Sequence, residues 1–123
     1  MMKTLLTVFV IVFVFRTGLC QESQNRYIDS LQHELAVADN DTIRFILFGR
    51  IADVYTEINS DSAFYYAEKV IPYTKKMQFK LEEATALGVM GYAQINLGNY
   101  PRSLEYFLSA IELASDVSSE KRV

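Results

Sequence analysis

Residues 87–110 read LGVMGYAQINLGNYPRSLEYFLSA, and this stretch decides the fold. Gly98 follows Leu97 where a first helix must stop, because glycine accepts the left-handed conformation found just past a helix end. Gly91 has no Cβ, so a second helix can approach its backbone closely. Beyond the turn, apolar residues recur at helical spacing, at Phe107, Ala110, Ile111 and Ala114. The stretch predicts a helix–turn–helix unit, although alone it also fits an ordinary helical hairpin.

A second copy of the pattern lies upstream. The first-helix positions recur at one constant spacing, in the pairs Phe48 and Leu87, Gly49 and Gly88, Ile51 and Met90, Ala52 and Gly91, and Tyr55 and Gln94. The second-helix positions recur at a spacing that is longer by one position, in the pairs Ala63 and Ser103, Ala67 and Phe107, and Ile71 and Ile111. A regular spacing of this kind is the signature of stacked repeats.

The pattern resembles the tetratricopeptide repeat (TPR), a helix–turn–helix unit of about 34 residues with the signature W-x2-L-G-x2-Y…A-x3-F…P. The matched positions are Leu87, Met90, Gly91, Ser103 and Phe107, and the departures are Gln94 and Ser115. The resemblance implies an all-α fold of antiparallel helix–turn–helix repeats, a right-handed α-solenoid of about two and a half repeats. It also implies a surface that binds another chain rather than a catalytic centre.

The first twenty residues resemble a secretory signal peptide. Lys3 precedes an apolar run of twelve residues, 4–15, and small residues stand at Gly18 and Cys20 before polar Gln21. The run is shorter than the about 20 residues of a membrane span. We expect a mature N-terminus at Gln21 and export, with the periplasm as the destination. Two alternatives stay open, namely a lipidated Cys20 and an uncleaved membrane anchor.

The predicted organisation follows from the repeats. A signal peptide occupies 1–20, an N-terminal helix or partial repeat 21–41, two repeats 42–78 and 79–117, and a polar tail 118–123. The expected helices are 24–37, 42–58, a helix from Ser62 that Pro72 kinks, 81–97 and 100–114. Asp41 or Thr42 is expected to cap the second of them. Ser115 to Val123 is expected to fray.

Charge and cysteine content exclude several classes of site. Residues 1–20 contain two of the 12 basic residues and no acidic one, so the mature chain carries ten basic against 15 acidic residues, a net charge of −5. Nucleic-acid binding is therefore not expected. Cys20 is the only cysteine, so the mature domain can form neither a disulfide nor a thiolate metal site.

No pattern for catalysis, metal binding or a cofactor is present in the sequence. His33 is the only histidine and is expected on a solvated helix face. Glu82 and Glu83 begin a predicted helix, where negative charge favours the helix dipole. The glycines of 87–98 follow no strand, so they do not form a phosphate-binding loop. We expect a protein that is not an enzyme and uses no cofactor.

The resemblance implies a concave groove lined by the first helix of each repeat. That groove would contain Ile46, Gly49, Asp53, Thr56 and Glu57 from one unit and Thr85, Gly88, Tyr92, Ile95 and Asn96 from the other. Family members that clamp a C-terminal carboxylate place Lys, Arg and Asn at such positions, so this chain is not expected to bind one. Tyr92 and Ile95 either form an apolar contact for a partner or pack against the next helix.

The mature chain also resembles the exported N-terminal repeat region of bacterial TPR-containing sensor histidine kinases. Residues 59–63, 66–69 and 97–100 are typical of that group. The resemblance implies a sensory or scaffolding role with a protein or peptide as partner. Alternatives are a truncated fragment of such a kinase without its catalytic part, or a glycan-binding helical-repeat lipoprotein. An exposed apolar face on the last helix also predicts self-association.

Overall fold

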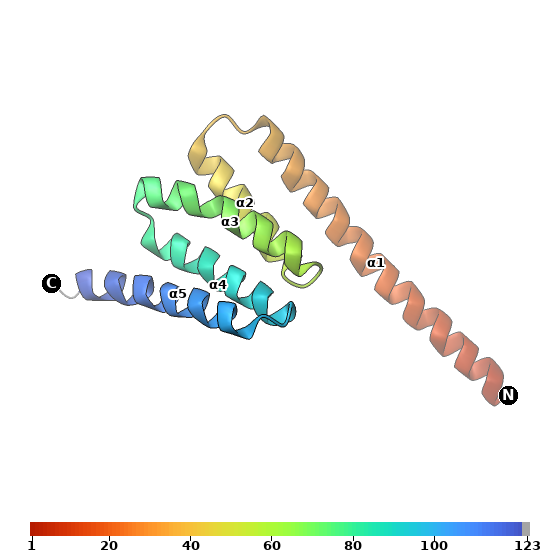
Figure 1. The fold of residues 1–123 in the computed structure, drawn as a ribbon. Coiled ribbons are helices and arrows are strands. Elements are labelled where there is room, and N and C mark those ends of the chain that lie inside the picture. The colour runs from red at the N-terminus through yellow and green to blue at the C-terminus, as the bar shows by residue number, and fades with distance from the viewer. Residues whose placement is uncertain (122–123) are drawn as a thin grey trace. The chain divides into compact units, whose positions relative to one another are not determined.

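The computed structural model describes residues 1–121, without the side chains of 15–17, and this part of the chain is all α-helical (Figure 1). The helices are α1 (Met2–Val37), α2 (Asp41–Tyr55), α3 (Ser60–Met77), α4 (Lys80–Asn96) and α5 (Tyr100–Glu120). The chain divides into two compact units, Met1–Ser30 and Leu31–Val123. The predicted fold class is confirmed.

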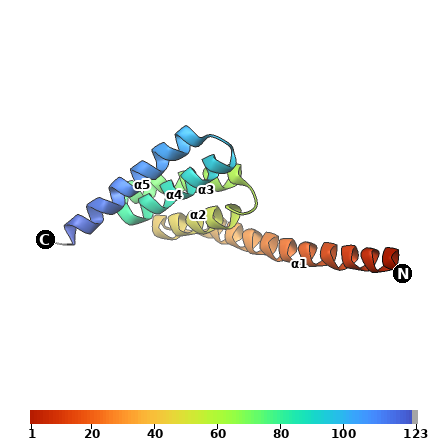
Figure 2. The same ribbon diagram turned by 90° about the horizontal axis from the view of Figure 1, so that it is seen from below.

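The second unit consists of two helix–turn–helix hairpins. α2 pairs with α3 and α4 pairs with α5, and α3 also packs against α4. In Figure 1, α2 and α4 run in one direction and α3 and α5 run in the opposite direction. Figure 2 shows the same four helices from a perpendicular view, with each helix lying beside the next. This alternation is the arrangement that the regular spacing of the repeated positions predicts.

Polar residues fix where the helices begin. The Asn40 Oδ1 atom accepts a 2.9 Å hydrogen bond from the Ile43 N–H, and Asn59 Oδ1 accepts one of the same length from the Ser62 N–H. The expectation that Asp41 or Thr42 caps α2 is therefore wrong. Asn40 is the residue with extended backbone angles just before the helix, and only that position lets a side chain bond the first free N–H groups.

Left-handed residues connect the helices. Gly98 adopts φ +78° just after α4, the first helix of the second hairpin, as the sequence indicates. Gln78 adopts φ 59° after α3, so a residue with a Cβ takes the same role between the two hairpins. Its N–H bonds the Lys75 carbonyl at 3.3 Å, and the Phe79 N–H bonds the Thr74 carbonyl at 2.9 Å. α3 runs through Pro72 without interruption.

The core lies between the hairpins. One cluster of buried residues joins Leu31 and Ala38 to Leu47 and Ile51, so the end of α1 packs on α2. A second cluster joins α2, α3 and α4 through Phe45, Val70 and Ala86, and a third joins the same helices through Ala52, Ala67 and Met90. The small residues among them, Ala52, Ala67 and Ala86, allow the three helices to approach each other.

Gly91 lies where α4 meets α5. A Cβ placed on Gly91 would lie 3.0 Å from Cε1 of Phe107, which is closer than carbon atoms normally approach. Ser103, in the place of the usual alanine, is buried on the facing side of α5. The TPR-type roles of Gly91, Ser103 and Phe107 are therefore confirmed.

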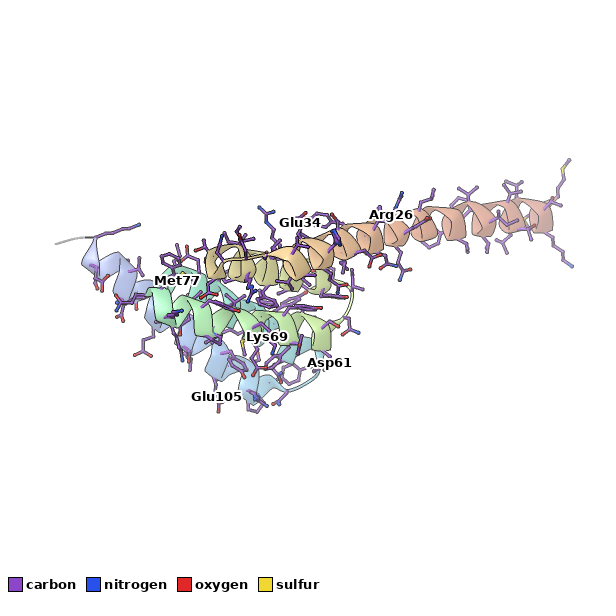
Figure 3. The ribbon with its side chains drawn as sticks, turned by 90° about the horizontal axis from the view of Figure 1, so that it is seen from above. Arg26, Glu34, Asp61, Lys69, Met77 and Glu105 are labelled. Carbon is purple, nitrogen blue, oxygen red and sulfur yellow. The ribbon has the colours of Figure 1, made fainter. Side chains whose placement is uncertain are left out.

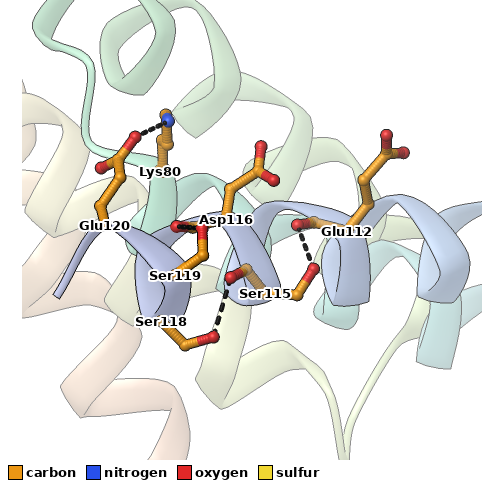
Figure 4. A network of polar contacts seen from close by, with 7 residues as sticks. All are labelled: Lys80, Glu112, Ser115, Asp116, Ser118, Ser119 and Glu120. Atoms are coloured by element: carbon orange, nitrogen blue, oxygen red, sulfur yellow. Dashed lines mark hydrogen bonds and ion pairs between the residues drawn. The ribbon is translucent and has the colours of Figure 1, made fainter. Parts of the chain in front are cut away.

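Two predicted boundaries are wrong. α2 ends at Tyr55 rather than at residue 58, and α5 continues to Glu120 instead of fraying from Ser115. Polar contacts hold the last turns of α5, as Figure 4 shows. Three serine hydroxyls donate to carbonyls one turn back, at 2.7–2.8 Å, from Ser115, Ser118 and Ser119. The ammonium of Lys80 also lies 2.6 Å from Glu120.

α1 starts at Met2 and not at residue 24, so the predicted signal segment and the first repeat helix form one continuous helix. Among the described residues this is the one helix that is long and apolar enough to cross a membrane. N-terminal signal sequences share that property, so it agrees both with export and with a membrane anchor.

Candidate interaction groove

An open groove lies between α2 and α4. Its volume is about 210 Å³, and α3 forms its floor. The lining residues are Phe45, Ile46, Gly49, Arg50, Ala52 and Asp53 from α2, Ala67 and Val70 from α3, and Glu82, Thr85, Ala86 and Val89 from α4. The groove is thus built by the first helices of both hairpins, with the second helix of the first hairpin between them.

Small residues keep the groove open. A Cβ on Gly49 would meet no atom within 4 Å, so this glycine is not needed for close packing and instead leaves space in the α2 wall. Ala52, Ala67 and Ala86 are buried at the floor, where longer side chains would fill the hollow. The result is an apolar floor that is accessible from outside.

Charged side chains line the walls. α2 provides Arg50 and Asp53, one helical turn apart, and α4 provides Glu82. Partial burial raises the pKa of the Asp53 carboxyl above its ordinary value, because the wall removes water from the charged form. Within the described residues neither carboxylate forms an ion pair, since the ion pairs there join Lys76 to Asp41 and Lys80 to Glu120. The walls therefore offer unpaired negative charge beside apolar surface.

The structure brings together four of the ten predicted groove residues, namely Ile46, Gly49, Asp53 and Thr85. The other six do not line the hollow: Thr56, Glu57, Gly88, Tyr92, Ile95 and Asn96. Thr56 donates its hydroxyl to the Ala52 carbonyl at 3.1 Å, at the end of α2. Gly88 has open space beside it, as Gly49 does.

Tyr92 and Ile95 lie on the same exposed stripe of α4. They are 40% and 38% exposed, so each is partly covered and partly accessible. Both interpretations of these residues, a contact for a partner and packing against a next helix, fit this exposure.

Arg50, Glu82 and Val89 were missed by the sequence reasoning. Arg50 and Val89 are equivalent positions in the two repeats, one residue after the paired glycines Gly49 and Gly88, and the repeat pattern could have paired them. Glu82 was interpreted as a residue that favours the helix dipole, and its place at the N-terminal end of α4 is confirmed. The groove lies diagonally, between the middle of α2 and the start of α4, and a position-by-position transfer from one repeat to the next does not predict that shift.

Outside the groove, aromatic rings dominate the packing of α2 against α3. Tyr55 stacks on Tyr66 with ring centroids 5.6 Å apart, and the Gln32 amide donates to the Tyr66 hydroxyl at 3.1 Å. Lys69, labelled on α3 in Figure 3, holds its ammonium 5.0 Å from the centroid of the Tyr65 ring. Among the described residues, no three His, Cys, Asp or Glu side chains come together as a metal site would require.

The family comparison agrees with this geometry. The family described as the SusR N-terminal TPR domain matches residues 18–120. The chain belongs to this TPR family. Searches among curated proteins and among solved structures gave no match. Tetratricopeptide repeats present stacked helices to other chains, so this TPR chain is a protein–protein interaction module.

Proposed function

We propose that the chain is an exported TPR module that binds a peptide segment of a partner protein in the α2–α4 groove, as the sensory or scaffold region of a signalling protein. The observation that carries the proposal is an open, apolar-floored hollow between the first helices of two adjacent repeats. Exposed Tyr92 extends apolar surface along α4 beyond the hollow. Binding, rather than catalysis, is the role that these groups support.

The size of the groove favours side chains of a peptide as the ligand. Pockets that enclose a small-molecule ligand have volumes of about 300–1,000 Å³. The hollow here, at about 210 Å³, is smaller and open on one side. It therefore suits one or two side chains of a longer segment that continues along α2 and α4.

A matched pair of glycine variants tests the groove. Gly49→Leu fills the hollow, whereas Gly88→Leu adds the same side chain at the equivalent position of the next repeat, outside the hollow, and neither Cβ meets an atom within 4 Å. Peptides are first selected from a random displayed library on the purified chain. We expect them to bind the parent and Gly88→Leu equally and to lose at least about tenfold in affinity for Gly49→Leu. Equal affinity for all three proteins would contradict the proposal.

Export is supported by the N-terminal helix, which is long and apolar enough for a signal sequence or an anchor. The proposed signalling role rests on the resemblance to the repeat region of sensor histidine kinases. Mass spectrometry of the protein from the expressing cell should find Gln21 as the first residue. A chain that starts at Met1, or a diacylated Cys20, would show that the segment is retained.

The link to sensor kinases has its own test. If the chain is the front of a sensor histidine kinase, the genomic sequence after codon 123 continues into a membrane helix and kinase motifs, in frame or after a frameshift. Unrelated sequence there supports a separate scaffold.

A further inference from the structure

The two carboxylates of the groove lie toward opposite ends of it. α2 and α4 run in the same direction (Figure 1). Asp53 is the last position of α2 that lines the groove, whereas Glu82 is the first position of α4 that does so. The α2 wall from Phe45 to Asp53 rises by about 12 Å, so the two negative charges are separated by roughly that length along the groove.

The surface between the carboxylates is apolar and carries one positive charge. Ala52, Ala67 and Ala86 form the buried floor, and Arg50 stands on the wall one turn before Asp53. A cation placed at the centre of the groove would meet the Arg50 guanidinium, whereas cations at the ends would meet Glu82 and Asp53. The groove therefore favours a ligand with an uncharged, apolar centre and positive ends.

Desolvation strengthens that preference. The pKa of Asp53 is raised by burial, and among the described residues its carboxylate forms no ion pair. A ligand cation beside Asp53 would supply the missing partner in a site where water is partly excluded, and electrostatic interactions are stronger there than in open solvent.

We propose that the natural occupant is an extended peptide segment with an aliphatic centre and two Lys or Arg side chains about four residues apart. An extended chain advances about 3.3 Å per residue, so about 12 Å corresponds to that spacing. The inference rests on the proposed function, because it names the partner chemistry of the same groove. It predicts both the sign and the spacing of the ligand charges.

Three peptides of equal length test the inference against the full chain, kept in solution with a mild non-ionic detergent. The first contains Lys-Ala-Leu-Ala-Lys, whose first, third and fifth side chains share one face of an extended chain, the second Lys-Lys-Ala-Leu-Ala with the same composition, and the third Glu-Ala-Leu-Ala-Glu, each with a fluorescent label and blocked ends. Fluorescence anisotropy gives the dissociation constants. We expect the first peptide to bind about 3- to 10-fold more tightly than the second and more tightly still than the third.

Charge variants assign the effect to the groove. In Asp53→Asn combined with Glu82→Gln, the preference for the first peptide should disappear. Added salt should weaken binding of the first peptide to the parent but should have little effect on its binding to this double variant. Glu57→Gln combined with Glu83→Gln removes two charges from outside the groove, just past the end of α2 and at the start of α4, and should leave the preference intact.

The outcomes separate the inference from the function on which it rests. If the peptides bind equally and Gly49→Leu weakens all of them, the groove binds peptides but the charge inference is wrong. If Gly49→Leu leaves the dissociation constants of the peptides unchanged, the groove is not the peptide site. No binding of the first peptide at millimolar concentration would also overturn the inference.

Discussion

The contact between Gly91 and Phe107 sets how closely α4 and α5 pack. The ring lies where a Cβ of residue 91 would stand, so any larger side chain must push the two helices apart. Gly91→Leu is expected to cost about 1–3 kcal/mol of unfolding free energy, because overpacked cores force off-rotamer side chains and backbone shifts. A thermal melt of the variant within a degree of the parent would show that the crossing tolerates a side chain.

Gly88→Ala is the matched control for that variant. Gly88 lies three positions earlier in α4 and faces open space. Its replacement should leave the protein as stable or stabilise it by up to about 1 kcal/mol, since alanine is a better helix former than glycine. If the unfolding free energy falls in Gly91→Leu but not in Gly88→Ala, the loss comes from packing rather than from helix propensity.

Asp53 predicts a pH dependence of stability. Partial burial raises its pKa in the folded chain above the ordinary value, so folding favours the protonated form. The contribution of the protonated Asp53 carboxyl to the free energy of unfolding is complete below the pKa of the unfolded chain. It is lost as the pH rises through the pKa of the folded chain. Asp53→Asn should therefore gain stability relative to the parent between about pH 3 and pH 7. Chemical denaturation across that range measures the difference, which would be constant if the carboxyl were fully hydrated.

At the scale of the helix, three asparagines begin α2, α3 and α5 but do not act alike. Asn40 and Asn59 each cap their helix with a side-chain hydrogen bond, whereas Asn99 makes none. Asn40→Ala and Asn59→Ala should each cost about 0.5–2 kcal/mol, and Asn99→Ala should cost clearly less. Urea titration of the three variants compares them directly. Equal losses would mean that the cap bonds do not stabilise the helices.

The end of α5 depends on contacts that link it to the start of α4. The hydrogen bond from Lys80 to Glu120 raises the pKa of the Lys80 ammonium, so the ion pair persists until the pH passes that raised value (Figure 4). Glu120→Gln should speed amide exchange in the last turn of α5 and leave the middle of the helix unchanged. Unchanged exchange at both places would show that the serine hydroxyl bonds alone hold the turn.

The sequence predicts most helices to within a few residues because glycines, asparagines and the repeat spacing mark the turns. It does not predict the last turns of α5, since Glu120 pairs with Lys80 at the start of the preceding helix, and local polarity carries no sign of that distant partner. The groove residues are predicted only in part, because they also come from segments that are distant in the sequence. Ile46 and Thr85 follow from the repeat, but Glu82 lines the groove from the first turn of α4, where the sequence indicates only a favourable contact with the helix dipole.

At the scale of the whole molecule, the outer face of α5 is more exposed than the equivalent face of α3. Phe64 and Ile71 on α3 pack in the cluster that includes Met90 of α4. Their equivalents in the next repeat, Leu104 and Ile111, are 59% and 64% exposed, and Leu108 between them is 57% exposed. Among the described residues this face is uncovered, although the equivalent face of α3 forms a repeat interface.

Self-association through this face is therefore expected. Sedimentation should show an assembly that grows with concentration, and Leu108→Lys should reduce it, because a charge at the centre of the face opposes apolar contact. Leu81→Lys, which changes an exposed leucine on α4, should have less effect. A monomer over a wide concentration range with a cooperative melt well above about 60 °C would show that the face needs no cover.

The most direct test of the whole account is a map of where a selected peptide binds. Backbone amide chemical shifts of the isotope-labelled chain are followed during titration with a peptide taken from the random library. The account predicts that the largest changes cluster at the groove, at Ile46, Gly49, Asp53 and Thr85, with little change along the outer face of α5. Changes centred on Leu104, Leu108 and Ile111 instead would contradict the claim that the α2–α4 groove is the binding site.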